Sequence, residues 1–448
     1  MIFYITLIVG LVLAWNVCRA MFHPGVALAL MWSLYPAEQL LQQGHPIFIQ
    51  ASSVMNFLFT GVCLVAVING LRLGKYRGWR IPPESTFCIG LFVFAWMTCL
   101  WSISQKATFL HLSNSAPYTF AYILVAPLCL TDEKQLRLAI NTTIFMGALI
   151  LLGHAFSGYG SRGVALMIVA GKVIEGNPLA VASYGGYVGV CALFSVYGRK
   201  FSPLVALKIA IFVLSAYVII KSSSRGQLVA LVAVSFIWLP VIAKATLKRS
   251  TIVAILGSAV IVFAAIYTYS NLLEGTGRWK AEHVEVASVG RFEMATRLLD
   301  YWVDKGPFNW LVGLGNSSSY RIVGFYPHNV PAEVLAEEGL IGFALLAAFV
   351  FSVLFRSGKM MFSADVEIES RVNLGILMAI FCFEGILTLK QGSMIGNVGW
   401  FSVGMTIGWL GERLKAQARK SKYREFVMKR LLFVPSAEQL AHGRSNVL

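Results

Sequence analysis

The residues with the clearest chemical potential in this chain are a histidine and an asparagine at the start of an apolar segment. His328 and Asn329 precede Pro331, which suits the first turn of a helix. A helix N-terminus disfavours a protonated imidazole, so we expect His328 to be neutral and able to accept a proton. The alternative is a histidine that caps the helix or forms a hydrogen bond with a loop carbonyl.

Three acids follow in the next turns of the same segment. Glu333 and Glu337 are four residues apart and share a helical face, where they can complement the helix dipole without any chemical role. Glu338 lies on a neighbouring face, and the dipole interpretation fits it less well.

Three arginines could hold an anion. Arg225 follows three serines where two apolar runs meet, so it is either a snorkelling arginine behind serine helix caps or a clamp for phosphate oxygens. Arg291 follows Gly290 at the expected start of a loop helix, where free backbone N–H groups favour an anion. The alternative there is a solvated arginine paired with an acid. Arg162, in a glycine-rich stretch, allows the same two interpretations.

Transmembrane helices must position these residues. Hydrophobic residues make up 57% of the 448 residues and charged residues only 13%, against about 25% charged in soluble proteins. Unbroken apolar runs recur along the chain, which predicts an all-α polytopic membrane protein with about 12–13 transmembrane helices. The expected spans lie near 1–18, 24–41, 50–70, 85–104, 113–130, 138–156, 177–197, 203–220, 226–243, 251–270, 333–355, 372–389 and 397–411.

The first two spans give the weakest signals. The segment 1–18 has no basic start and no cleavage site, so we expect a retained helix and not a signal peptide. The segment 24–41 contains two prolines and could be a partial or re-entrant helix.

The formal net charge of +16 reflects topology and not nucleic-acid binding. Lys and Arg cluster in short loops that alternate with loops poor in basic charge, as the positive-inside rule predicts. The basic tail is then cytoplasmic and can touch anionic lipid heads. The expected organisation is an N-terminal helix bundle, a large periplasmic loop, C-terminal helices and a basic tail, at 1–270, 271–332, 333–411 and 412–448.

The loop 271–332 is far longer than the roughly 12–15 residues beyond which structureless loops become uncommon. It contains apolar residues at helical spacing, namely Phe292, Ala295, Leu299 and Trp302. The pattern predicts an amphipathic helix on the membrane face, which ends at Gly306 and Pro307.

The sequence contains no metal-ligand or nucleotide-binding motif. The seven cysteines lie in or beside apolar segments without metal-ligand spacing, and no Walker loop or nucleophile elbow is present. We therefore expect no cofactor and chemistry that is independent of metal.

Several motifs, in order over residues 157–400, resemble the O-antigen ligase and polymerase superfamily of periplasmic-facing glycosyltransferases. One spacing departs from the family pattern, because the interval from Pro307 to Gly313 is longer than usual. The matching elements are the helix start at Asn177, Ser224 to Gly226, Gly290 and Arg291, Pro307 to Gly315, His328 and Asn329, and Glu338 to Gly342.

The resemblance implies a glycan donor carried on undecaprenyl pyrophosphate and transfer to a sugar hydroxyl at the periplasmic face of the bacterial inner membrane. Arginines would stabilise the pyrophosphate leaving group, and the histidine would position or deprotonate the acceptor. The implied catalytic residues are His328, Arg291 and Arg225, and the implied substrate-binding residues are Arg162, Asn329 and Glu338.

Several functions remain open within and outside this superfamily. A ligase accepts lipid A-core, a polymerase accepts another carrier-linked repeat, and a protein O-glycosyltransferase accepts a serine or threonine. The modest size of the loop 271–332 favours the ligase. A transporter of lipid-linked glycans is the alternative from another class, but such proteins often show repeated halves, and the sequence contains no detectable repeat.

Overall fold

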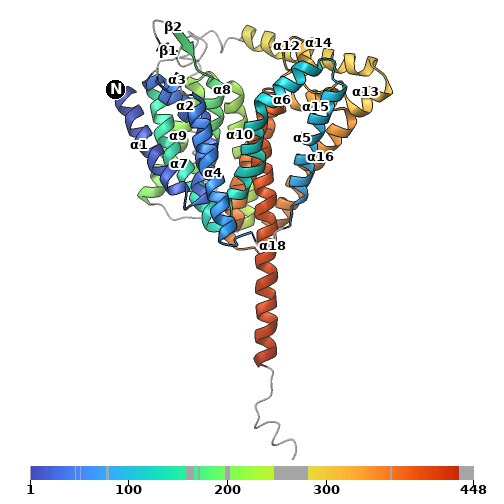
Figure 1. The fold of residues 1–448 in the computed structure, drawn as a ribbon. Coiled ribbons are helices and arrows are strands. Elements are labelled where there is room, and N and C mark those ends of the chain that lie inside the picture. Colours follow the sequence, from blue (N-terminus) through green and yellow to red (C-terminus); the bar gives the residue numbers. More distant parts are fainter. Residues whose placement is uncertain are drawn as a thin grey trace, which may run out of the picture.

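A computed structural model shows a bundle of membrane-length helices, so the predicted all-α polytopic membrane fold is confirmed (Figure 1). Two short antiparallel strands, β1 (Leu166–Val169) and β2 (Lys172–Glu175), pair with each other. The structure describes residues 2–45, 47–50, 52–76, 80–157, 166–169, 172–196, 202–246, 281–363 and 366–432.

Nine helices within these described ranges are long and apolar enough to cross a membrane. The expected span 251–270 lies outside the described residues, so the predicted total of 12–13 helices stays a prediction. The nine are α1 (Ile2–Ala20), α4 (Ser52–Arg72), α5 (Pro83–Met97), α7 (Glu133–Phe156), α8 (Pro178–Ser195), α9 (Pro203–Lys221), α10 (Arg225–Thr246), α16 (Gly339–Met361) and α17 (Ile368–Thr388).

Three other expected spans take different forms. Helix α2 (Pro24–Gly44) runs without a break through Pro36 and is buried along most of its length, so the expectation of a partial helix was wrong. The expected span 113–130 is irregular: α6 (Gln105–Thr119) passes into a π-helical segment η2 and a 3-10 turn η3, which extend it to Cys129. Helix α18 (Val398–Leu432) continues for 35 residues, about 52 Å, well beyond the expected end at 411.

The expected span 333–355 is divided in two. Helix α15 (Val330–Glu337) ends before Gly339, where α16 begins in a new direction. Gly339 has a φ of +69°, and an added Cβ would collide with the backbone of Leu311, so only glycine fits this junction. Because of this break, α15 lies at the end of the bundle opposite the extension of α18, whereas α16 is long and apolar enough to cross the membrane.

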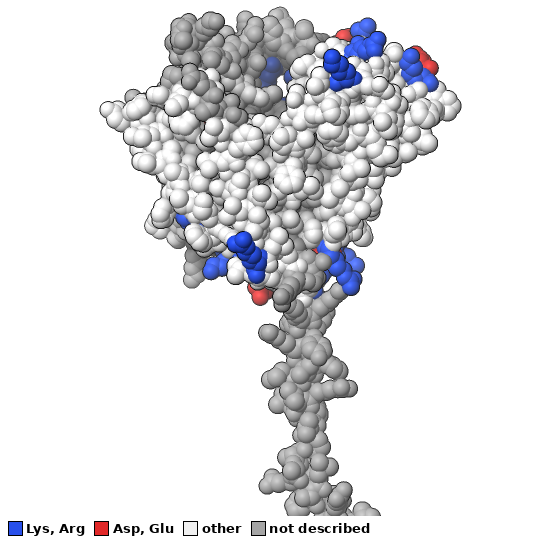
Figure 2. Space-filling model, in the orientation of Figure 1, with Lys and Arg blue, Asp and Glu red and all other residues white. Residues whose placement is uncertain are grey.

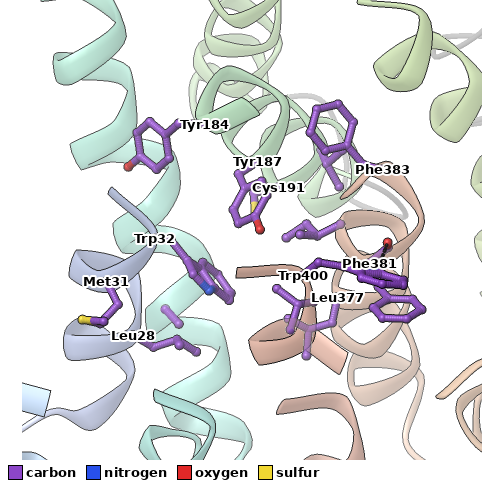
Figure 3. Close-up of a cluster of buried hydrophobic side chains, with 14 of the residues drawn as sticks. Leu28, Met31, Trp32, Tyr184, Tyr187, Cys191, Leu377, Phe381, Phe383 and Trp400 are labelled. Carbon is purple, nitrogen blue, oxygen red and sulfur yellow. Dashed lines mark hydrogen bonds between the residues drawn. The ribbon is translucent and has the colours of Figure 1, made fainter. Parts of the chain in front are cut away.

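Helix α8 lies in the middle of the bundle because its glycines allow close packing. An added Cβ at Gly186 would collide with the ring of Phe383 from α17, and one at Gly189 would press on Ser215 from α9. Small residues at such contacts let membrane helices approach closely. Tyr187 of the same helix packs edge-on against Trp32 of α2 and Phe383 of α17 (Figure 3).

Residues 281–337 form an ordered layer, here called the outward layer, at the end of the bundle opposite the extension of α18 (Figure 1). It consists of α12 (Ala281–Asp304), α13 (Pro307–Val312), α14 (Ser319–Ile322) and α15. Leu298, Leu314 and Ala336 are buried together and form a small outer core of their own. The layer is therefore a packed cap and not a flexible connection.

The predicted amphipathic helix is confirmed as α12, with two corrections. The helix begins at Ala281, about ten residues before the expected start, so Arg291 lies in its middle and not at its N-terminus. Phe292 is 74% exposed, whereas Leu298, which the predicted stripe omitted, is fully buried. The buried face is thus rotated relative to the predicted one.

Charged side chains mark the two ends of the bundle. Figure 2 shows Lys and Arg at both ends, with an uncharged band between them that suits a membrane. At the end from which α18 extends, Arg356 of α16 pairs with Glu84 of α5 and Glu412 of α18. These ion pairs join three helices at that face.

We expect the layer around α12 to be periplasmic and the tail cytoplasmic. In a cysteine-free background, Lys305→Cys on the exposed loop and Ser436→Cys in the tail would be treated with a membrane-impermeant maleimide in intact spheroplasts. Lys305→Cys should react at once, and Ser436→Cys only after lysis. The opposite pattern would invert the proposed topology.

Candidate functional site

Three cations from distant parts of the chain converge at the end of the bundle opposite the extension of α18. Lys390 follows α17, and its amine packs against Gly226 in the first turn of α10, next to Arg225. Arg291 of α12 donates a hydrogen bond to the carbonyl oxygen of Lys390 at 3.2 Å. Burial, together with the charges of Arg291 and Arg225, lowers the pKa of Lys390 to about 8. We call these three residues the cation cluster.

Two members of the cation cluster differ from the charged residues at the other end of the bundle. Within the described part of the chain, neither Arg291 nor Lys390 forms an ion pair, whereas the ion pairs at the other face each contain a glutamate. Like charges brought together repel one another, and a bound anion relieves that repulsion. Arginine and lysine are also the side chains that bind phosphate oxygens most strongly. The cluster therefore has the properties of an anion site.

Asn329 connects the cation cluster to the outward layer. Its Oδ1 accepts a hydrogen bond from the backbone N–H of Ala332 at 3.0 Å, which caps α15. Its Nδ2 donates to the carbonyl oxygen of Leu389 at 3.3 Å, one residue before Lys390. One end of the side-chain amide thus caps α15, and the other holds the turn that carries Lys390.

Two further hydrogen bonds fix the same turn. Gln227 of α10 donates to Oε1 of Gln391 at 2.8 Å, across 164 residues of sequence. Oε1 of Glu333 accepts a hydrogen bond from the backbone N–H of Met394 at 3.2 Å. The turn between α17 and α18 is therefore fixed from both α10 and α15.

His328 lies beside the cation cluster in a strained backbone conformation. Its φ is +57°, and its ring centroid lies 4.5 Å from that of Tyr326. Burial and the charge of Arg291 lower its pKa to about 4, so the imidazole is neutral at pH 7. A neutral imidazole was expected, although the expected cause was the N-terminus of the following helix. The residue that caps this helix is Asn329 and not His328.

Both acids of α15 hold loops, and for Glu337 this corrects the dipole interpretation, whereas Glu333 lies in the first turn as expected. Glu337 lies in the last turn of α15, where the helix dipole disfavours a carboxylate. Its two oxygens accept hydrogen bonds from the backbone N–H groups of Ser317 at 2.6 Å and Ser319 at 2.8 Å. Burial raises the pKa of Glu337 to about 7, although these hydrogen bonds oppose the rise. Burial also raises the pKa of Glu333 well above its usual range.

Glu338 is fully buried and accepts a hydrogen bond from Nδ2 of Asn316 at 2.8 Å. Burial raises its pKa well above the usual range. The side chain does not reach the surface in this structure. Glu338 therefore holds the loop at Asn316 and is not part of the cation cluster.

The glycine-rich segment that precedes Asn316 holds its loop against the residues between α5 and α6. The longer interval after Pro307 forms the short helix α13, and Gly313 and Gly315 then adopt φ values of +79° and +92°. An added Cβ at Gly315 would collide with Ser102. The N–H of the next residue, Asn316, donates to Oγ1 of Thr98 at 2.8 Å. The longer spacing is thus taken up by the short helix α13.

The remaining predicted residues lie in different settings. Arg225 is the first residue of α10, as expected, but the hydroxyls of Ser222 and Ser224 donate to carbonyl oxygens at the end of α9, so they do not act as the expected caps of α10. Arg162 lies outside the described residues.

A pocket of about 430 Å³ opens beside the cation cluster and extends into the bundle. Its rim includes Gln391, the neighbour of Lys390, and Tyr326. Deeper in, Trp32 of α2, Tyr187 of α8 and Trp400 of α18 line its wall, and Figure 3 shows their side chains. The pocket therefore places aromatic and polar side chains beside the turn that carries Lys390.

Lys390 is the main residue that the sequence-based prediction missed. The signal was present, because a lysine at the outward end of a span departs from the positive-inside pattern. Gln227 was missed as well, and its role depends on a partner on a distant helix.

The fold defines a multi-pass membrane protein, with a candidate anion site at the end of the bundle opposite the extension of α18. Residues 210–347 match a family model described as O-antigen ligase, which confirms the resemblance inferred from the motifs. The matched segment contains Arg225, Arg291 and His328, whereas Lys390 lies beyond it. No curated protein matches the chain.

Lys390→Met should weaken the binding of inorganic pyrophosphate to the purified protein by about 10–100-fold, because a charge-assisted hydrogen bond is lost. Wild-type affinity should also fall above pH 8 as Lys390 loses its proton, whereas Lys390→Arg should keep it. Isothermal titration calorimetry measures both effects. The matched control is Lys359→Met at the exposed end of α16, and wild-type affinity in Lys390→Met would contradict the assignment.

Proposed function

We propose that the protein is a glycosyltransferase of the O-antigen ligase type. It transfers a glycan from undecaprenyl pyrophosphate to a sugar hydroxyl of lipid A-core at the periplasmic face of the inner membrane. The observation that carries this proposal is the cation cluster next to the neutral imidazole of His328. The match of residues 210–347 to the O-antigen ligase family supports the same reaction class.

The chemistry of the transfer requires charge stabilisation on one side of the reacting carbon. The bond between the sugar C1 and the phosphate oxygen breaks, and the pyrophosphate leaves with the bonding electrons. Arg225, Arg291 and Lys390 offer permanent or nearly permanent positive charge where this negative charge develops. Arg162 is a further candidate ligand of the donor, on the basis of the sequence alone.

On the other side of C1, the acceptor oxygen forms the new bond and loses its proton. His328 is the proposed base, since its imidazole is already neutral and accepts that proton. Arg291 then has two roles, because its charge holds the donor and also disfavours a protonated His328. Asn329 and Glu338 act as positioning residues, through the turn before Lys390 and the loop at Asn316.

A lipid-linked donor also needs room for its carrier at the membrane. The pocket below the cation cluster provides space for the part of the donor next to the pyrophosphate, among Trp32, Tyr187 and Trp400. No group of three or more potential metal ligands occurs among the described residues, and the proposed chemistry uses side-chain cations in place of a metal.

Purified protein in vesicles with carrier-linked glycan should transfer the glycan to lipid A-core, with and without EDTA. Arg291→Ala should lower turnover by about 10²–10³, as expected for a lost charge-stabilising donor, and Arg291→Lys should restore only part. The control is Arg297→Ala, exposed on the same helix. Elongation of the donor in place of lipid A-core would identify a polymerase. Movement of intact donor across the membrane without transfer would identify a transporter.

The pH profile tests the role of His328. With a pKa of about 4, the imidazole is neutral over pH 5–8, so turnover at saturating donor should be flat there and fall below about pH 4. Arg291→Gln removes one cause of the low pKa of His328. In this variant, the fall in residual turnover at acid pH should therefore occur at a higher pH.

His328→Gln retains hydrogen bonding but cannot accept a proton at these pH values. A base therefore predicts that glutamine is as inactive as alanine, while donor affinity is retained in both variants. Substantial activity in His328→Gln would limit His328 to orienting the acceptor.

A further inference from the structure

Aromatic rings gather on the outward layer immediately before His328. Tyr320 of α14 lies 5.9 Å from Phe325 between ring centroids, and Phe325 lies 4.1 Å from Tyr326. We call these three residues the aromatic platform. Among the described residues, none of the three rings belongs to the membrane core or to the small outer core. Packing of the fold therefore does not account for their presence.

The aromatic platform is open to the outside. Tyr320 is 39% exposed and Phe325 is 44% exposed. The hydroxyls of Tyr320 and Tyr326 form no hydrogen bond with any residue that the structure describes. Contiguous exposed apolar surface typically marks a binding site. This surface combines flat apolar faces with hydroxyl groups at the rim, so it suits a ligand that offers both kinds of contact.

The platform is held rigidly from below. Gly324, with a φ of +80° and open space beside it, reverses the chain between the rings. The backbone N–H of Ser319 donates to Glu337 at 2.8 Å, and Arg321 donates to the carbonyl oxygen of Ile103 at 2.8 Å. These contacts anchor α14 at both of its ends, so the platform is organised before a ligand arrives.

The platform continues directly into the proposed catalytic centre. The ring of His328 lies 4.5 Å from Tyr326 and 5.4 Å from Phe325 between centroids. Tyr326 also lines the rim of the pocket beside the cation cluster. A six-membered ring that lies on the platform would have one edge within reach of His328.

We propose that the aromatic platform binds the acceptor sugar. The pyranose would stack its C–H face on Phe325 and bond its hydroxyls to Tyr320 and Tyr326, which brings one hydroxyl to His328. This inference rests on the proposed function, in which the acceptor is a sugar. The other occupant would be the lipid headgroup region, since Tyr and Trp also anchor membrane proteins at that level. A sugar is favoured because the platform is rigid and adjoins the base.

Phe325→Leu keeps an apolar side chain but removes the flat face. It should raise the KM for lipid A-core about tenfold, equivalent to about 1.4 kcal/mol, without changing kcat or the KM for donor. The matched control is Phe308→Leu, which removes a ring that is 65% exposed on α13 in the same outward layer. An unchanged acceptor KM in Phe325→Leu, or the same change in both variants, would show a membrane anchor in place of a sugar platform.

A second measurement separates this inference from the proposed function. Saturation-transfer NMR with soluble core oligosaccharide and no donor reports sugar protons in contact with the protein. We expect contact in the wild type and in Phe308→Leu, and loss of contact in Phe325→Leu. Absence of contact in the wild type would overturn the platform. Contact that depends on Phe325, combined with no transfer in the assay above, would contradict only the proposed function.

Discussion

The repulsion among three cations at the outward end of the bundle is the constraint on which the site depends. Arg291 donates to the backbone of Lys390, and the amine of Lys390 packs on the first turn of α10 next to Arg225. Burial, and then the charges of Arg291 and Arg225, lower the pKa of Lys390, so its cationic form is disfavoured in this setting. The packed helices around the cluster must supply the free energy that keeps it assembled, and a bound anion would return part of it.

Buried carboxyl groups hold the loops around this assembly. Glu337 and Glu333 accept hydrogen bonds from backbone N–H groups of two different loops, and Glu338 holds the side chain of Asn316. Burial raises the pKa of all three, so their negative charge is weakened near the cations. The layer thus combines rigid loops with a positive field, which is the combination that a charged leaving group requires.

The membrane helices and the outward layer are stabilised in different ways because they lie in different solvents. Within the bundle, glycine positions such as Gly186 allow close helix contacts, and the backbone is satisfied inside each helix. The outward layer has its own small core and capped helices, and it carries both His328 and the aromatic platform. A rigid frame below and an ordered cap above would let two lipid-anchored substrates meet at a fixed height.

The sequence by itself determined the all-α membrane class, most helix positions and the loop helix, and it singled out Arg225, Arg291 and His328 as candidate site residues. Hydropathy, periodicity and charge act over one or two turns of chain, so they can be read locally. Tertiary structure decided the rest. Lys390 joins Arg291 across 99 residues, Glu337 binds backbone amides instead of a helix dipole, and α12 begins before its predicted start. Burial and convergence depend on which distant helices pack together, and no local pattern contains that information.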